Sequence, residues 1–166
     1  MRLSLARMTS ASHRSEDALA TLACAALRVR PRPRVLIGGL GMGYTLRAAL
    51  DVLPPAAHVT VAELNPDVAA WCRGPLAPLT NAAVADSRVT VVIADVAAHL
   101  AAVPRGRYDA ILLDLYEGPH AATQRPDDPL YGPAALARTR AALSPGGVFA
   151  VWSEEPDRPF ERRLGA

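Results

Sequence analysis

The sequence predicts an α/β fold in which helices cover both faces of a doubly wound sheet of five parallel strands, ordered 3-2-1-4-5. Short runs rich in Val, Ile and Leu alternate with helix-like segments along the chain. Such continuous apolar strands are typical of a parallel sheet buried on both faces. The right-handed crossover between consecutive parallel strands then favours this strand order.

Composition limits the class of protein. The 166 residues suffice for one hydrophobic core, and 51% hydrophobic with 20% charged residues indicates a globular chain. No apolar run has the length of a membrane span, so no membrane partner is expected. We expect residues 1–14 to form a flexible leader and residues 15–166 to form a single domain.

The first helix is expected to begin at Ser15, whose hydroxyl can cap it. Glu16 and Asp17 then lie in the first turn, where acids complement the helix dipole. The prolines at 31 and 33 end the segment. Spacing predicts an apolar face made of Leu19, Leu22, Ala23, Ala26 and Leu27.

The other elements follow in alternation. Strands are expected at 34–38, 58–64, 88–94, 108–115 and 146–153, and helices at 44–53, 66–76, 96–103 and 134–143. In an open parallel sheet, ligands bind at the carboxyl ends of the strands, where the strand order reverses. The residues just after each strand are therefore the candidates for a functional site.

Charge and cysteine content suggest no nucleic-acid partner and no metal. All 18 basic residues are arginine and the net charge is only +2, so we interpret the "RVRPRPR" segment at 28–34 as a solvated linker. Cys24 and Cys72 lie far apart, which favours reduced thiols and a cytoplasmic location. The four histidines lack metal-ligand spacing.

A glycine-rich turn follows the first strand. Gly39, Gly41 and Gly43 provide positive φ angles and allow close approach of a ligand to the backbone. In the GxGxxG dinucleotide fingerprint the third glycine would fall at Tyr44, whereas the spacing here is GxGxG. The turn therefore favours a nucleoside without phosphates over a dinucleotide.

Carboxylates follow the next three strands. Glu63 lies 20 residues after Gly43, where an acid can accept both ribose hydroxyls. Asp95 follows the third strand and can accept the exocyclic amine of an adenine, and Asp114 follows the fourth. An acid after a strand can also simply cap the next helix, and for Asp95 capping and binding are equally good interpretations.

With these features the sequence resembles the class I S-adenosylmethionine-dependent transferases, and among them the spermidine synthase group of polyamine aminopropyltransferases. The resemblance runs from about residue 15 to 163. It rests on the glycine loop after "VLI", on "VAELNPDVAAWCR", on "ADV", on "YDAILLDLYEGP" and on "PLYGPAALARTRAALSPGGVFAVW". It implies a Rossmann-like nucleoside-binding domain.

The resemblance also implies roles for the candidate residues. The glycine loop and Glu63 would hold the methionine-derived end and the ribose of the cofactor, and Asp95 its adenine. Asp114 would bind the attacking amine and remove its proton, with Glu117 as a second acid. Independently of the resemblance, Tyr116 and Tyr131 are candidates to line the amine pocket, although ordinary packing explains them equally well.

The sequence departs from this group in two respects. Met42 occupies the position of the loop acid that meets the amino group of decarboxylated S-adenosylmethionine. An N-terminal β-hairpin domain and the final strands also have no counterpart, so a minimal or truncated member is expected. The fifth strand is then a sheet edge, which leaves a homodimer possible.

We therefore expect a chain that binds an S-adenosylmethionine-type nucleoside, either S-adenosylmethionine or its decarboxylated form, and transfers an aminopropyl group to a polyamine or diamine acceptor without a metal. An S-adenosylmethionine-dependent methyltransferase is the alternative, since it uses the same fold and the same nucleoside-binding acids. A non-catalytic nucleoside-binding module or a degenerate fragment is the second alternative.

Overall fold

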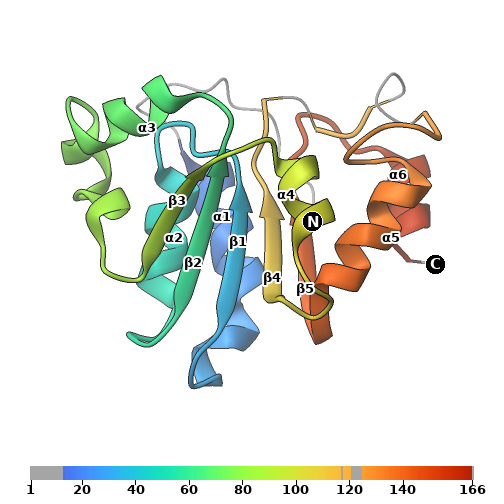
Figure 1. Cartoon of the computed structure of the whole chain (residues 1–166), viewed down its shortest axis with the longest axis horizontal. Coiled ribbons are helices and arrows are strands. Elements are labelled where there is room, and N and C mark those ends of the chain that lie inside the picture. The colour runs from blue at the N-terminus through green and yellow to red at the C-terminus, as the bar shows by residue number, and fades with distance from the viewer. Residues whose placement is uncertain (1–12, 117, 121–124, 166) are drawn as a thin grey trace.

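The computed structural model describes residues 13–116, 118–120 and 125–165, and it is an α/β sandwich around one parallel sheet (Figure 1). The expected 1–14 leader lies almost entirely outside these residues. The elements in chain order are α1 (Arg14–Cys24), the 3-10 helix η1 (Ala25–Val29), β1 (Arg34–Gly38), α2 (Tyr44–Val52), β2 (His58–Glu63), α3 (Pro66–Arg73), the 3-10 helices η2 (Ala77–Thr80) and η3 (Ala83–Ala85), β3 (Val89–Ile93), α4 (Val96–Ala102), β4 (Tyr108–Leu113), α5 (Pro133–Ala142), β5 (Leu143–Val151) and α6 (Arg158–Leu164).

The five strands are parallel and ordered β3-β2-β1-β4-β5, which confirms the predicted fold class and strand order. The central strands are the most deeply buried. All six residues of β4 are buried, as are the last four of β1. From β1 the chain first adds strands on one side of the sheet, β2 and β3, and then on the other side, β4 and β5. The direction of the strand order therefore changes between β1 and β4, and parallel sheets bind ligands at such a point.

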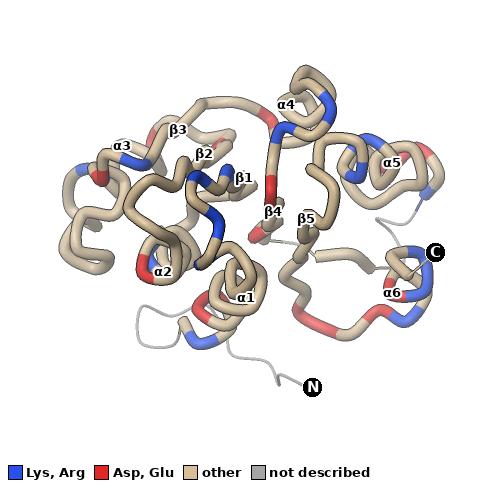
Figure 2. The backbone as a smooth tube through the Cα atoms, turned by 90° about the horizontal axis from the view of Figure 1, so that it is seen from below, with Lys and Arg blue, Asp and Glu red and all other residues tan. Residues whose placement is uncertain are grey.

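Two apolar layers hold the helices against the sheet. Val35, Ile37, Val59 and Val61 point to one face, where α1, α2 and α3 pack, and Leu36 and its neighbours point to the other. Figure 2 looks along the strands and shows α1 and α2 on one side of the sheet, with α4 and α5 on the opposite side. No helix in the described part of the chain is long and apolar enough to cross a membrane.

The prediction for the start of α1 was wrong in detail. His13, not Ser15, is the N-cap residue, and it makes no capping side-chain hydrogen bond. The Ser15 hydroxyl instead donates to the carboxylate of Glu16 at 2.5 Å. Leu22 is 63% exposed, because α1 turns Ala20 and Cys24 toward the sheet alongside Ala23 and Leu27.

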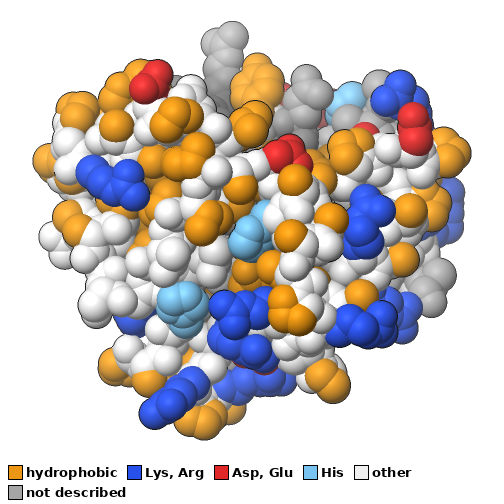
Figure 3. All heavy atoms as spheres, viewed as in Figure 1, with side chains coloured by type: hydrophobic (Ala, Val, Ile, Leu, Met, Phe, Trp, Pro, Cys, Tyr) orange, Lys and Arg blue, Asp and Glu red, His pale blue; other side chains and the backbone are white. Residues whose placement is uncertain are grey.

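The arginine-rich linker before β1 is partly structural, which corrects the interpretation of a merely solvated segment. Asp109, at the start of β4, accepts hydrogen bonds from Arg30 Nη1 at 2.7 Å, from the Arg34 amide at 2.8 Å and from Ser144 Oγ at 2.7 Å. These contacts fasten the linker to β4 and to β5. In Figure 3 arginine side chains gather at the lower rim of the molecule, over the amino ends of the strands.

Candidate active site

The predicted site residues follow the carboxyl ends of four neighbouring strands. Gly38, at the end of β1, pairs in register with Ala62 of β2 and with Leu113 of β4, and Glu63 pairs with Ile93 of β3. The strand ends are therefore level with one another. The glycine loop and the three predicted acids lie along this single edge, which is at the top of Figure 1.

The loop between β1 and α2 needs its glycines. Gly39, Gly41 and Gly43 have φ angles of 90°, 51° and 87°, a region that side chains other than glycine rarely adopt. A Cβ atom on Gly39 would lie 2.3 Å from the carbonyl oxygen of Asp114. Gly39 thus permits the loop to pass directly against the residue that ends β4.

Glu63 is 9% exposed and fixed by the backbone on both sides. Its Oε2 accepts a hydrogen bond from the amide of Leu40 in the glycine loop, and its Oε1 accepts one from the amide of Asn65, both at 2.8 Å. Each carboxylate oxygen can accept a second hydrogen bond. Glu63 therefore orients the loop and retains capacity for a ribose, a role that stays a prediction.

Asp95 is the N-cap residue of α4. Its Oδ1 accepts a hydrogen bond from the amide of Ala98 at 2.8 Å, and the residue is exposed at the edge of the sheet. The capping interpretation is therefore correct. Capping uses one oxygen of the carboxylate, so a contact to adenine remains compatible with it and stays a prediction.

Asp114 has the most unusual electrostatic environment of the three acids. Its amide donates to the Gly38 carbonyl at 2.9 Å, and its Oδ2 accepts from the Thr45 hydroxyl at 2.5 Å. The pKa of Asp114 is raised to about 6, mainly by burial and in smaller part by the charge of Glu16, while the Thr45 hydrogen bond lowers it. A carboxylate of this kind is mostly ionised at neutral pH, yet it binds a proton more readily than an ordinary one.

The first turn of α2 faces the same edge without an acid. Gly43 is its N-cap residue, no side chain caps the helix, and no acidic residue lies in the first turn. The positive end of the helix dipole therefore meets no negative charge from the first turn of α2 itself. Met42, the residue in place of a loop acid, adds no negative charge there.

The residues predicted to bind the acceptor differ in their exposure to solvent. Tyr116 follows Asp114 by two residues and is 86% exposed. Glu117 lies outside the described residues. Tyr131 is 3% exposed and its ring meets Phe160 of α6 edge-on, with centroids 5.6 Å apart, so it takes part in packing.

Sequence reasoning missed two residues that act on Asp114: Thr45, through a hydrogen bond, and Glu16, through its charge. The sequence placed Thr45 in a helix and assigned Glu16 only to the helix dipole. Neither residue carries a signal for this role, because both act on Asp114 only once the helices have packed on the sheet. Among the described residues, no group of three or more His, Cys, Asp or Glu side chains could hold a metal ion.

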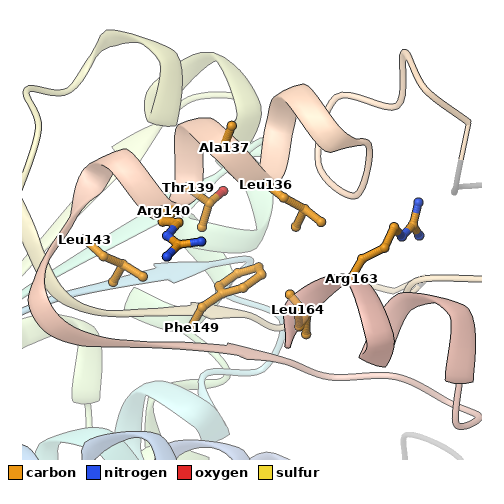
Figure 4. A pocket seen from close by; sticks show the side chains of 8 residues that line it. All are labelled: Leu136, Ala137, Thr139, Arg140, Leu143, Phe149, Arg163 and Leu164. Atoms are coloured by element: carbon orange, nitrogen blue, oxygen red, sulfur yellow. The ribbon is translucent and has the colours of Figure 1, made fainter. Parts of the chain in front are cut away.

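A separate hollow of about 260 Å³ lies between α5, β5 and α6 (Figure 4). Its walls are mainly apolar and include Leu136, Leu143 and Phe149, with Arg140 and Arg163 from the two helices. None of the predicted site residues that the structure describes lines it. The hollow is therefore distinct from the candidate active site.

Curated relatives match most of this chain. The chain is 34% identical over 125 residues to putrescine N-methyltransferase 3 of Nicotiana tabacum, covering 75% of this chain and 31% of the tobacco protein. It is 35% identical over 124 residues to polyamine aminopropyltransferase 2 of Streptomyces coelicolor, covering 73% and 21%. The chain thus spans about a third of the length of the tobacco protein.

Solved structures and a family comparison agree with these relatives. Spermidine synthase from Thermotoga maritima has a TM-score of 0.68 and 26% identity, covering 90% of this chain and 50% of that one. A spermidine synthase in complex with the transition-state analogue AdoDATO has a TM-score of 0.67 and 25% identity, covering 90% and 49%. Residues 16–159 match the spermine/spermidine synthase domain. The chain therefore belongs to the spermine/spermidine synthase family.

Proposed function

We propose that this chain binds a sulfonium nucleoside of the S-adenosylmethionine type and transfers an alkyl group from it to a small amine. The observation that carries the proposal is the position of Asp114, a carboxylate with a raised pKa, beside the glycine loop and two strands away from Glu63. The nucleoside would lie over the loop, with its ribose on Glu63 and its adenine toward Asp95.

The donor brings its own leaving group, so the protein has to orient the amine and accept a proton. Asp114 suits both tasks. Its carboxylate attracts an alkylammonium ion, and its raised pKa makes it a better acceptor for the proton that the amine must lose. Thr45 holds one oxygen, which leaves the other to face the acceptor.

Between the two donors, the loop favours S-adenosylmethionine itself and therefore methyl transfer. Residues 38–43 contain no carboxylate to meet the ammonium group of a decarboxylated donor. The positive end of the α2 dipole, with no acid in the first turn, instead favours a carboxylate, which only the intact methionine moiety carries. The tobacco relatives, which are putrescine N-methyltransferases, support this choice.

Aminopropyl transfer is the second candidate function. Its support is the match to the spermine/spermidine synthase domain and the similarity to aminopropyltransferases of Streptomyces coelicolor and Prochlorococcus marinus. It requires that the acceptor or another segment replace the missing loop acid. The acceptor would in both cases be a diamine or polyamine.

Ligand-induced stabilisation separates these possibilities. S-adenosylmethionine, its decarboxylated form and methylthioadenosine would be compared by thermal shift and by turnover with putrescine. A ligand at a hundred times its Kd adds about 2.7 kcal/mol to the apparent stability. We expect stabilisation by methylthioadenosine and methylation with S-adenosylmethionine; turnover with only the decarboxylated donor would favour the second candidate, and binding without turnover would favour a binding module.

Two variants assign the roles of the acids. Asp114→Asn should keep the affinity for methylthioadenosine within a few fold and lower turnover by roughly a hundred- to ten-thousand-fold. Glu63→Gln should instead weaken methylthioadenosine, since it removes charge-assisted hydrogen bonds worth roughly 1.5 to 3 kcal/mol each. Asp67→Asn, a change of an exposed acid on α3, is the matched control and should alter neither property.

Domain organisation, location and partners are also proposed. We infer that residues 15–166 act as a single nucleoside-binding domain in the cytoplasm, without a nucleic-acid partner or a metal. A homodimer through the exposed edge of β5 is consistent with its position at the end of the sheet. Sedimentation of the purified chain would test the oligomeric state.

A further inference from the structure

Glu16 is a buried acid that the mechanism above does not use. It lies in the first turn of α1 and is 8% exposed, whereas acids at this position of a helix are ordinarily solvated. Its described polar partner is the hydroxyl of Ser15, at 2.5 Å. No ion pair within the described residues involves Glu16.

The first turn of α1 packs on the segment that holds Asp114. The ring of His13 stacks on Tyr44, the first residue of α2, with centroids 4.3 Å apart and planes 13° from parallel. Thr45, the next residue, donates its hydroxyl to Asp114. The helix α1 also contacts β4, the strand that ends just before Asp114. The helix that carries Glu16 is thus packed against the two elements that hold Asp114, and the charge of Glu16 raises the pKa of Asp114.

We propose that Glu16 is a positioning residue for proton transfer at Asp114, where its negative charge strengthens Asp114 as the base and helps it attract a cationic amine. The inference rests on the proposed function, because it concerns the same reaction. It assigns a role to a residue that does not itself touch the reacting atoms.

Both protons and electrons balance in the transfer step. The alkylammonium acceptor transfers one proton to the Asp114 carboxylate, which leaves a lone pair on the amine nitrogen. This pair forms the new C–N bond, and the C–S bond breaks with its electrons on sulfur, so the sulfonium becomes a neutral thioether. Asp114 then releases its proton to water. The charge of Glu16 favours the first transfer, because it raises the proton affinity of Asp114.

The other groups around Asp114 do not supply this effect. On α1, His13 and Asp17 pair with each other at 2.8 Å. On α2, Thr45 donates a hydrogen bond, which lowers the pKa of Asp114. Tyr116, beyond β4, is exposed. Among the described ionisable groups, Glu16 is the one whose charge raises the pKa of Asp114.

The test is the pH profile of kcat/KM for the acceptor in Glu16→Gln, a substitution of nearly equal shape. The wild-type profile should rise near pH 6, the pKa of Asp114. In the variant the acidic limb should move to lower pH, and kcat/KM at pH 8 should fall by roughly tenfold or less, since the base remains but is weaker. Glu16→Asp, which keeps the charge, should retain the wild-type limb.

Asp17→Asn is the matched control, because it removes one negative charge from the same turn at a residue paired with His13. It should leave the acidic limb where it is. If the acidic limb moved equally in Asp17→Asn and Glu16→Gln, the proposal would be overturned. The movement would then reflect the loss of one negative charge from the protein and not the position of Glu16. Glu16→Leu, which suits a buried position, repeats the test should the glutamine variant fail to fold.

A second readout does not depend on turnover. The carboxyl carbon of Asp114, titrated by NMR in the unliganded protein, should show a lower pKa in Glu16→Gln than in the wild type. An unchanged titration would overturn the role of Glu16 even in an active enzyme. A shifted titration in a protein that turns over no amine would support the coupling and reject the proposed function.

Discussion

Asp114 illustrates at the scale of one residue how burial changes the chemistry of a carboxylate. Its environment favours the neutral form through desolvation, and the Thr45 hydroxyl only partly offsets this. The group therefore destabilises the folded chain whenever it is ionised. A residue kept at such a cost is characteristic of a functional position.

Asp114→Asn should for this reason stabilise the protein above pH 6. The pKa of Asp114 is raised from 3.8 to about 6, so the folded state binds a proton that the unfolded state has already released between these values. The stability of the wild type accordingly falls relative to the variant as pH rises from about 4 to 6, by roughly 1 to 3 kcal/mol in total. Urea denaturation at pH 4 and pH 8 would measure it, and an equal difference at both values would contradict this account.

The glycine loop allows a matched pair of substitutions. Gly39 and Gly43 both have positive φ, but a Cβ on Gly39 would meet the Asp114 carbonyl at 2.3 Å, whereas a Cβ on Gly43 would meet Thr80 at an ordinary 3.4 Å. Gly43→Ala should cost about 1 kcal/mol from backbone strain alone. Gly39→Ala should cost clearly more and displace Asp114, which thermal unfolding and the Asp114 titration would detect. Equal costs would show that the loop relaxes freely.

At the scale of the elements, Arg88 joins the end of α2 to the start of β3. Its Nη1 donates to the carbonyls of Leu50 and Leu53 at 3.0 and 3.1 Å, and its guanidinium also pairs with Asp86. The hydrogen bonds from Arg88 lower the pKa of Asp86 to about 2. This single side chain thus satisfies carbonyls that the end of a helix leaves unpaired.

Arg88→Gln should lower stability at pH 7 by about 2 kcal/mol, because it removes the ion pair and leaves two carbonyls without this donor. The pKa of Asp86 is depressed, so its contribution is fully present above about pH 4 and is lost as pH falls toward 2. The deficit of the variant should therefore shrink in acid. Asp51→Asn, which breaks the exposed pair with Arg47, serves as the control and should change stability by less than about 0.5 kcal/mol.

At the scale of the whole molecule, the central strands of the sheet are the most deeply buried and are expected to resist local unfolding best. The residues of β1 and β4 are buried between two helical layers, whereas β3 forms one edge and exposes Ile93 by 51%. Amide hydrogen exchange should be slowest in β1 and β4 and clearly faster in β3. The candidate active site lies at the carboxyl ends of β1 and β4. These two buried, paired strands set the position of Asp114 relative to the glycine loop. Equal protection in β3 and β4 would contradict this description.

The order of strands and helices is contained in the sequence itself. The apolar runs are too continuous for strands with one solvated face, so they specify a parallel sheet that is covered on both faces. The right-handed crossover between consecutive parallel strands then limits the strand order. The positions of Gly39, Glu63, Asp95 and Asp114 at one edge follow as well, because each lies at the end of a strand or within two residues of it. These properties depend on local periodicity and on the general geometry of parallel sheets.

Only the tertiary structure determined what surrounds these residues. The orientation of α1, which buries Glu16 and exposes Leu22, depends on how its surface fits α2 and the sheet, and helical spacing alone leaves several such fits open. The hydrogen bond from Thr45 to Asp114 joins positions 69 residues apart. The protonation behaviour of Asp114 arises from desolvation and a neighbouring charge, which exist only once distant segments of the chain have packed together.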